Sequence, residues 1–227
     1  MDSALDHHAD QLFGPKPSPP DPVRVSDAVD TLPERPAEAV PDKTPLQVGR
    51  RLTERQHRLL WRRVRGVEGF WETLEETEPG IVARLAAVAS ERRWEIIFLT
   101  KRPATAGATS QLQSQRWLTA KGFQFPSVYV VTGSRGLIAA ALALDIVVDD
   151  RPENCLDVAT DSVARIIAVV RQTQPPPPTF LKTMGVELVR STGECLDLLM
   201  EMDAAARRRP GPMERLMRKV GLRQAKA

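Results

Sequence analysis

Two adjacent carboxylates, Asp149 and Asp150, directly follow the apolar run Ile146–Val148, and Asn154 lies four residues further on. Neighbouring carboxylates repel each other unless a cation or hydrogen bonds compensate them. Oxygen ligands from a few side chains suit Mg²⁺, which keeps its other positions for water and phosphate oxygens. These three residues therefore predict a magnesium site. Alternatively, one of the two aspartates only caps a helix that begins near Pro152.

Hydroxyl and cationic side chains follow two other apolar runs. Thr100 ends the run IIFLT and is followed by Lys101 and Arg102, whose charges and amides suit a phosphate group. Arg135, just beyond the run VYVVT, is a fixed cation that can neutralise the same anion. Each cluster alone is a weak signal. A hydroxyl, a cation and a paired acid after three successive apolar runs together predict a site for a phosphate-containing small molecule.

A site of this kind needs a scaffold that brings three strand ends together. From Pro79 onward, helical patterns alternate with short apolar runs. We expect strands at 96–100, 128–132, 146–149, 165–170 and 186–189, and helices at 80–93, 109–121, 135–144, 152–161 and 193–202. This alternation favours a parallel sheet covered by helices on both faces. Ligands of such sheets bind beyond the carboxyl ends of the strands, where the three clusters lie.

The flanking segments differ from this middle part. Residues 1–48 hold nine of the nineteen prolines and show no sustained hydrophobic period, so we expect most of this tail to be disordered. In the domain expected over 49–202, residues 49–68 predict a short arginine-rich helix. Residues 203–227 predict a basic tail with a short amphipathic helix, which either packs on the domain or docks to an acidic partner, a membrane surface or nucleic acid.

The composition argues against several classes of protein. A formal net charge of +3 is too small for the chain as a whole to indicate a nucleic-acid binder. Two cysteines, Cys155 and Cys195, do not make a disulfide framework. The N-terminus lacks the apolar region of a signal peptide, and no run of about 18 apolar residues occurs. We therefore expect a cytoplasmic protein without a transmembrane segment.

The order FLTKRP, VTGSRG and IVVDDRPENC resembles the second, third and fourth motifs of the haloacid dehalogenase (HAD) superfamily, and especially its 5'(3')-deoxyribonucleotidase-like branch. Gly69–Leu74 and Pro79–Gly80 resemble the segment by which the cap of these proteins re-enters the core. The resemblance implies an α/β fold, a three-layer α/β/α sandwich with a mostly parallel sheet and a small helical cap. It also implies a Mg²⁺-dependent phosphoric monoester hydrolase.

The same resemblance implies roles for individual residues. Thr100 would hydrogen-bond the phosphoryl group, and Arg135 would take the place of the family's lysine. Asp150, together with Asp149, would hold Mg²⁺. An arginine at position 135 keeps the positive charge of that lysine but not its compact ammonium group.

The family's first motif, DxDGT, supplies the nucleophilic aspartate and the acid-base aspartate, and no intact copy occurs in this sequence. The nearest segment is Val23–Leu32, where Asp27 aligns with the nucleophile but Val29 replaces the second aspartate. Arg24 also fits poorly in a strand buried on both faces. Three interpretations remain: a weak or inactive HAD-like domain, an active phosphatase that uses Asp27 or a motif lost through a wrongly assigned start, and a non-catalytic module that binds phosphate or a partner.

Overall fold

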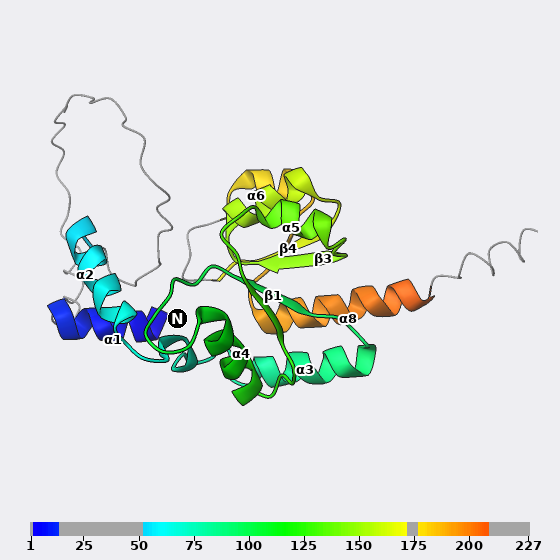
Figure 1. The fold of residues 1–227 in the computed structure, drawn as a ribbon. Coiled ribbons are helices and arrows are strands. Elements are labelled where there is room, and N and C mark those ends of the chain that lie inside the picture. Colours follow the sequence, from blue (N-terminus) through cyan, green and yellow to red (C-terminus); the bar gives the residue numbers. More distant parts are fainter. Residues whose placement is uncertain (1, 14–51, 172–176, 209–227) are drawn as a thin grey trace, which may run out of the picture.

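The computed structural model describes residues 2–13, 52–171 and 177–208 (Figure 1). The helices are α1 (Asp2–Phe13), α2 (Glu54–Arg65), the short 3₁₀ helix η1 (Phe70–Glu72), α3 (Ile81–Arg92), α4 (Ser110–Ala120), α5 (Arg135–Ala141), α6 (Pro152–Asp161), α7 (Thr179–Thr183) and α8 (Thr192–Arg208). The strands are β1 (Ile97–Thr100), β2 (Ser127–Val130), β3 (Ile146–Asp149), β4 (Arg165–Val169) and β5 (Glu187–Val189). None of the described helices combines the length and the apolar character needed to cross a membrane.

The strands form two parallel sheets. In one sheet β1 pairs with β2, with Ile97 opposite Ser127. In the other the order is β3–β4–β5, with Ile146 opposite Arg165 and Ile167 opposite Glu187. A helix follows each of β1 to β4, which is the connection that parallel neighbours require. The predicted α/β class and parallel pairing are confirmed, whereas the single sheet expected from the sequence is divided into two within the described part of the chain.

The core of the larger sheet lies on both faces of β4. Ile166 and Ala168 pack with the buried residues of α6, and Ile167 and Val169 pack with Cys195 at the start of α8. Figure 1 shows the α5–α6 pair on one side of β3 and β4 and α8 on the other. Because both faces are covered, β4 reads as a continuous apolar run, as the sequence analysis expects for a parallel strand.

Helix α1 lies in the tail that the sequence predicts to be disordered. Leu5 and Ala9 are fully buried against Leu60 and neighbouring residues of α2 and η1. Residues 2–13 of this tail are helical, because tertiary packing on α2 stabilises a helix whose apolar period is too short to stand out in the sequence. The rest of that tail, residues 14–51, lies outside the described residues, as does the predicted basic helix beyond 208.

Helix α8 is longer than the sequence analysis expects. It continues through 203–208, which we assigned to the basic tail, because no glycine or proline interrupts the chain before Pro210. Asp203 in this extension accepts a hydrogen bond from Arg92 of α3 at 3.3 Å. The domain therefore extends beyond the predicted boundary at residue 202.

Gln113 joins α4 to η1 and to the loop after β1. Its side chain is fully buried, and its Oε1 accepts the backbone N–H of Trp71 at 3.0 Å. Its amide nitrogen donates to Thr105 Oγ1 at 3.0 Å and to the carbonyl of Ala108. A buried amide with both ends satisfied holds the two segments in one arrangement.

The predicted helix α2 is also confirmed, and Thr53 and Gln56 form its capping box.

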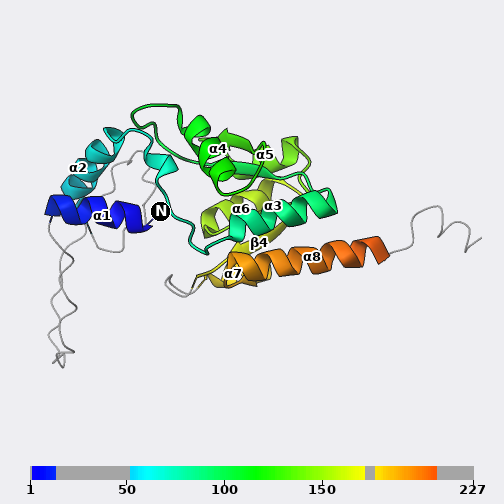
Figure 2. The same ribbon diagram turned by 90° about the horizontal axis from the view of Figure 1, so that it is seen from below.

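Glu78 ties the segment before α3 to the start of α8. Its carboxylate accepts the backbone N–H groups of Thr192 at 2.6 Å and Gly193 at 2.8 Å. Arg84 of α3 donates to Asp197 of α8 at 2.5 Å, and Figure 2 shows the two helices alongside each other. Burial alone would raise the pKa of Glu78, but the two backbone hydrogen bonds outweigh it and hold the pKa below its usual value.

We expect Glu78→Gln to lower the stability at neutral pH by about 1 kcal/mol, because a neutral amide loses the charge that favours the N-terminus of α8. The melting temperature should fall by roughly 2–4 °C. Because the pKa of Glu78 is lower in the folded state than in the unfolded state, its contribution is fully present above about pH 4.5 and is lost as the pH falls through the folded-state pKa. Circular dichroism melts from pH 7 to pH 3 test this, with the exposed Glu75→Gln as the control. A difference between the Glu78 variant and the wild type that stays constant with pH would contradict it.

Candidate functional site

The sequence-predicted groups lie at the carboxyl ends of parallel strands. Thr100 ends β1, Arg135 begins the helix after β2, and Asp149 ends β3. Arg135 and Asp149 are close enough for each charge to influence the pKa of the other. The structure therefore brings residues 14 positions apart to one edge, as the sequence predicts. Asp27 lies outside the described residues.

Arg135 is the least exposed charged side chain in the described ranges, with 9% of its surface accessible. Its Nη1 is buried and has no hydrogen-bond partner. Burial lowers its pKa, and the nearby negative charges of Asp149 and Asp157 oppose that shift. Neither carboxylate forms a salt bridge with it. A buried donor without an acceptor destabilises a protein, so this guanidinium suits an anion that supplies the missing acceptor.

The carboxylate of Asp149 is occupied by hydrogen bonds from its own loop. Asn154 Nδ2 donates to both of its oxygens, at 2.9 and 3.0 Å, and the backbone N–H of Arg151 donates to Oδ1 at 2.9 Å. Burial raises the pKa of Asp149, and these hydrogen bonds partly oppose the rise. Asp149 thus organises the turn that leads into α6. It does not cap the helix itself, because Arg151 is the N-cap residue of α6 and no side chain caps that helix end.

The predicted magnesium ligands do not form a complete site by themselves. Asn154 turns its N–H₂ group, which cannot bind a metal, toward Asp149. These hydrogen bonds do not involve its Oδ1, so its role as an oxygen ligand stays a prediction. Asp150 is exposed in the bend that follows β3. Among the described residues, no group of three His, Cys, Asp or Glu side chains gathers where a metal could bind.

The N-terminus of α5 is already filled by a carboxylate of the protein. Asp157 of α6 accepts the backbone N–H groups of Arg135 and Gly136, the latter at 3.2 Å, and the hydroxyl of Ser134 at 2.9 Å. A bound anion must therefore meet the side chain of Arg135 rather than the helix end. Sequence reasoning missed Asp157 because its partners lie more than twenty positions away and no local pattern marks them.

The structure also corrects the expected role of Arg102. Its Nη1 donates to Ser114 Oγ at 2.7 Å, and its guanidinium lies over the ring of Trp71, 5.0 Å from the ring centre. Burial lowers its pKa to about 10. Arg102 thus packs against α4 and η1 instead of extending toward a phosphate. Lys101 is exposed, and Thr100 is half-buried at the end of β1.

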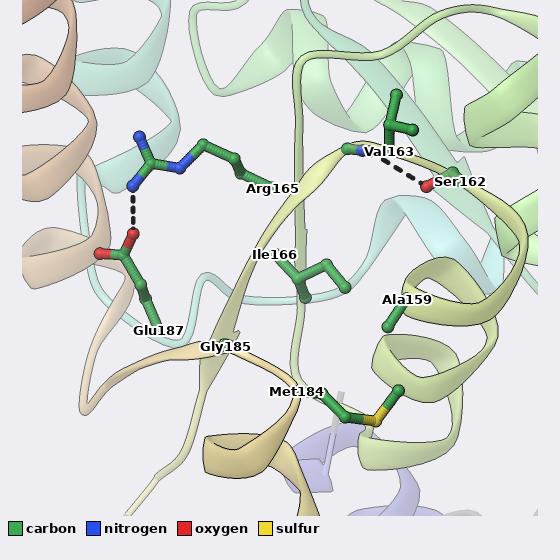
Figure 3. A pocket seen from close by; sticks show the side chains of 9 residues that line it. Ala159, Ser162, Val163, Arg165, Ile166, Met184, Gly185 and Glu187 are labelled. Carbon is green, nitrogen blue, oxygen red and sulfur yellow. Dashed lines mark hydrogen bonds and ion pairs between the residues drawn. The ribbon is translucent and has the colours of Figure 1, made fainter.

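Neither the buried thiol of Cys155 nor the hollow at the amino ends of β4 and β5 offers a catalytic group. Cys155 is buried, and burial together with the charges of Asp149 and Asp150 raises its pKa to about 12, so its thiol is not a nucleophile. A hollow of about 280 Å³ lies at the amino ends of β4 and β5, the edge opposite to Arg135 (Figure 3). The charged groups that line it, Arg165 and Glu187, are paired with each other at 2.5 Å.

Gly136 allows α5 and α6 to approach, and a methyl group there would overlap the carbonyl of Asp157. We therefore expect Gly136→Ala to destabilise the domain by about 1–3 kcal/mol, because the two helices must separate. Gly133→Ala is the matched control, since no atom lies within 4 Å of a methyl group built at that position. Urea unfolding of the two variants checks the prediction. Equal midpoints for both would show that α5 and α6 are not closely packed.

No protein-family model matches this sequence, and comparison with curated proteins and with solved structures likewise gives no match. The resemblance to the HAD superfamily therefore depends on the residues at the strand ends. The structure adds parallel strands that place Arg135 and Asp149 at a common edge.

Proposed function

We propose that this chain is a HAD-like domain of nucleotidase ancestry that binds a phosphate-containing small molecule and hydrolyses it weakly or not at all. In this proposal the two sheets and their helices belong to a three-layer α/β/α sandwich. Its small helical cap is the segment 49–68, of which α2 is the helix. The observation that carries the proposal is the buried guanidinium of Arg135, whose Nη1 has no acceptor beside the carboxyl edge.

Electrostatics favour an anion at this edge. The charge of Arg151 lies close enough to lower the pKa of Arg135, and the carboxylates of Asp149 and Asp157 act in the opposite direction. Burial raises the pKa of Asp149, because removal from water destabilises its negative charge. A phosphate brings two negative charges and acceptors for Nη1. The hydroxyl of Thr100, from the other sheet, would complete the contact.

Weak catalysis follows from the groups that the described residues offer. The two-step route through a phospho-enzyme needs a carboxylate free to attack phosphorus. Asp149 is held by Asn154 and Arg151, and Cys155 is a protonated, buried thiol. An active Mg²⁺-dependent phosphomonoesterase would require Asp27, or a carboxylate outside this sequence, to reach the edge.

Binding is tested by calorimetric titration of the full chain with inorganic phosphate and with a nucleoside 5'-monophosphate. We expect saturable binding with Kd in roughly the micromolar-to-millimolar range. Arg135→Gln should weaken it by about tenfold or more, since a charged hydrogen bond contributes about 1.5–3 kcal/mol. Thr100→Val should weaken it less, since the hydroxyl is neutral.

The control for this titration is Arg165→Gln, which removes an arginine from the opposite edge of the sheet and should leave the affinity unchanged. Circular dichroism shows whether each variant is folded, and the Thr100 variant provides the test if the Arg135 variant is not. Absence of saturable binding, or equal affinity in all three variants, would refute the proposed site.

Hydrolysis is tested separately with p-nitrophenyl phosphate and Mg²⁺. We expect the wild-type chain to be no faster than Asp150→Ala, because the sequence contains no intact DxDGT motif whose first aspartate would form the covalent intermediate. A Mg²⁺-dependent turnover that Asp27→Ala abolishes would instead identify an active phosphatase with Asp27 as its nucleophile.

A further inference from the structure

Helix α2 is strongly basic. Its twelve residues contain five arginines and one glutamate, which gives the helix a net charge of +4 when its histidine is neutral. The formal net charge of the whole chain is only +3, so the residues outside α2 together have a net charge of −1. A protein that is not basic overall can thus present one strongly basic surface, and such a surface attracts an anionic partner.

Four of the five arginines lie along one face of α2. At about 3.6 residues per turn they fall within about 80° of one another around the helix axis. Leu60 and Val64, the buried residues of α2, lie on the opposite face and pack in the cluster with α1 and η1. These four residues, all exposed, form a surface that we call the arginine stripe: Arg55, Arg58, Arg62 and Arg65. The stripe therefore faces away from the packed side of the helix.

The protein compensates little of the charge of the arginine stripe. Arg58 pairs with Glu54, but the two groups are 3.9 Å apart and their side chains are 71% and 70% exposed. Such a surface pair contributes little to stability. The other three arginines of the stripe form no salt bridge with a carboxylate in the described ranges. Because like charges three or four positions apart repel each other on a helix, a ligand of opposite charge would stabilise this face.

We propose that the arginine stripe binds the phosphate backbone of a duplex nucleic acid without reading its sequence. Arg55 and Arg65 lie about 15 Å apart along the helix, at about 1.5 Å per residue. Over that length one strand of a duplex presents about four phosphates, at about 3.4 Å each along its axis. Four arginines on a capped, packed helix thus match about four phosphates. Contacts to phosphate position a protein on a duplex but do not distinguish one base pair from another.

The types of side chain on α2 favour a duplex over other nucleic acids. The cations of the stripe are all arginines, whose planar guanidinium groups can bind phosphate oxygens in pairs. Single strands are usually bound by aromatic side chains on which the unpaired bases stack. Trp61 of α2 instead packs in the cluster with η1, with its ring centre 6.4 Å from that of Trp71. It is therefore not available as a platform for bases.

A membrane surface or an acidic protein fits this helix less well. An amphipathic helix binds a membrane by placing its apolar face among the lipids, and the apolar face of α2 is covered by α1 and η1. Protein interfaces generally depend on buried apolar or aromatic anchors at their centre. The one large apolar side chain that α2 exposes is Leu59, at 38%. The stripe thus offers charge without an apolar anchor, which suits a phosphate backbone.

Binding is tested by fluorescence anisotropy of the full chain with a labelled DNA duplex of about 20 base pairs, several times the length that the stripe spans. We expect a Kd of roughly 1–100 µM near physiological salt, equal for two unrelated sequences. The double variant Arg55→Gln, Arg62→Gln should weaken binding by about tenfold or more. Its plot of log affinity against log salt should be less steep by about 1.8, because each lost phosphate contact removes about 0.9 from the slope.

The matched control is Arg93→Gln. Arg93 is an exposed arginine at the C-terminal end of α3, and α3 lies apart from α2 in both Figure 1 and Figure 2. This variant should keep the affinity and the salt dependence of the wild type. Because all the replaced side chains are exposed, we expect each variant to remain folded, and circular dichroism checks this.

Several results would overturn the inference. These are an absence of duplex binding, a salt slope that the double variant leaves unchanged, and equal weakening by Arg93→Gln. Tighter binding to phosphatidylserine vesicles would identify a membrane surface instead, and tighter binding to polyglutamate would identify an acidic protein. The inference does not depend on the phosphate site at Arg135. The duplex carries no terminal phosphate, and loss of its binding in Arg135→Gln but not in the double variant would assign it to that other site.

Discussion

The carboxylate of Asp157 holds α5 against α6, and the position of Arg135 depends on this contact. Asp157 accepts the first two backbone N–H groups of α5, which would otherwise lack partners in a buried helix end. Gly136 has no side chain, so the helices approach until the carbonyl of Asp157 lies against its Cα. The guanidinium of Arg135 is thereby withdrawn from solvent and placed near Asp149. Without this helix pair, the cation would lie in water and would have little preference for a particular anion.

At the carboxyl edge, burial and neighbouring charges consequently act in opposite directions on the ionised groups. Burial disfavours the charge of Arg135 and that of Asp149, so each is stabilised by the other. Asn154 and the turn at Arg151 satisfy the oxygens of Asp149. Nη1 of Arg135 has no such partner. At this edge, therefore, the oxygens of Asp149 are engaged in hydrogen bonds and Nη1 of Arg135 is not.

The order of the elements and the residues at the strand ends were predictable from the sequence. Apolar runs of four to six residues between helical patterns placed all five strands to within a residue or two, and the polar residues after them marked the edge. Helix α1 was not predictable, because Leu5 and Ala9 are buried by α2, which follows about forty residues later. Arg102 was assigned to the wrong surroundings for the same reason, since Trp71 and Ser114 come from separate elements.

The sequence by itself determined the α/β class and the kinds of groups available at the strand ends, because hydrophobic period and residue type are local properties. Only the tertiary structure decided which of those groups are free to act. Asn154 presents its N–H₂ group to Asp149, Arg102 packs on an aromatic ring, and Arg135 keeps an unsatisfied buried donor. These differences arise from contacts between residues far apart in the chain. The free energy of burying a charge depends on which partners the fold brings to it, and no local pattern contains that information.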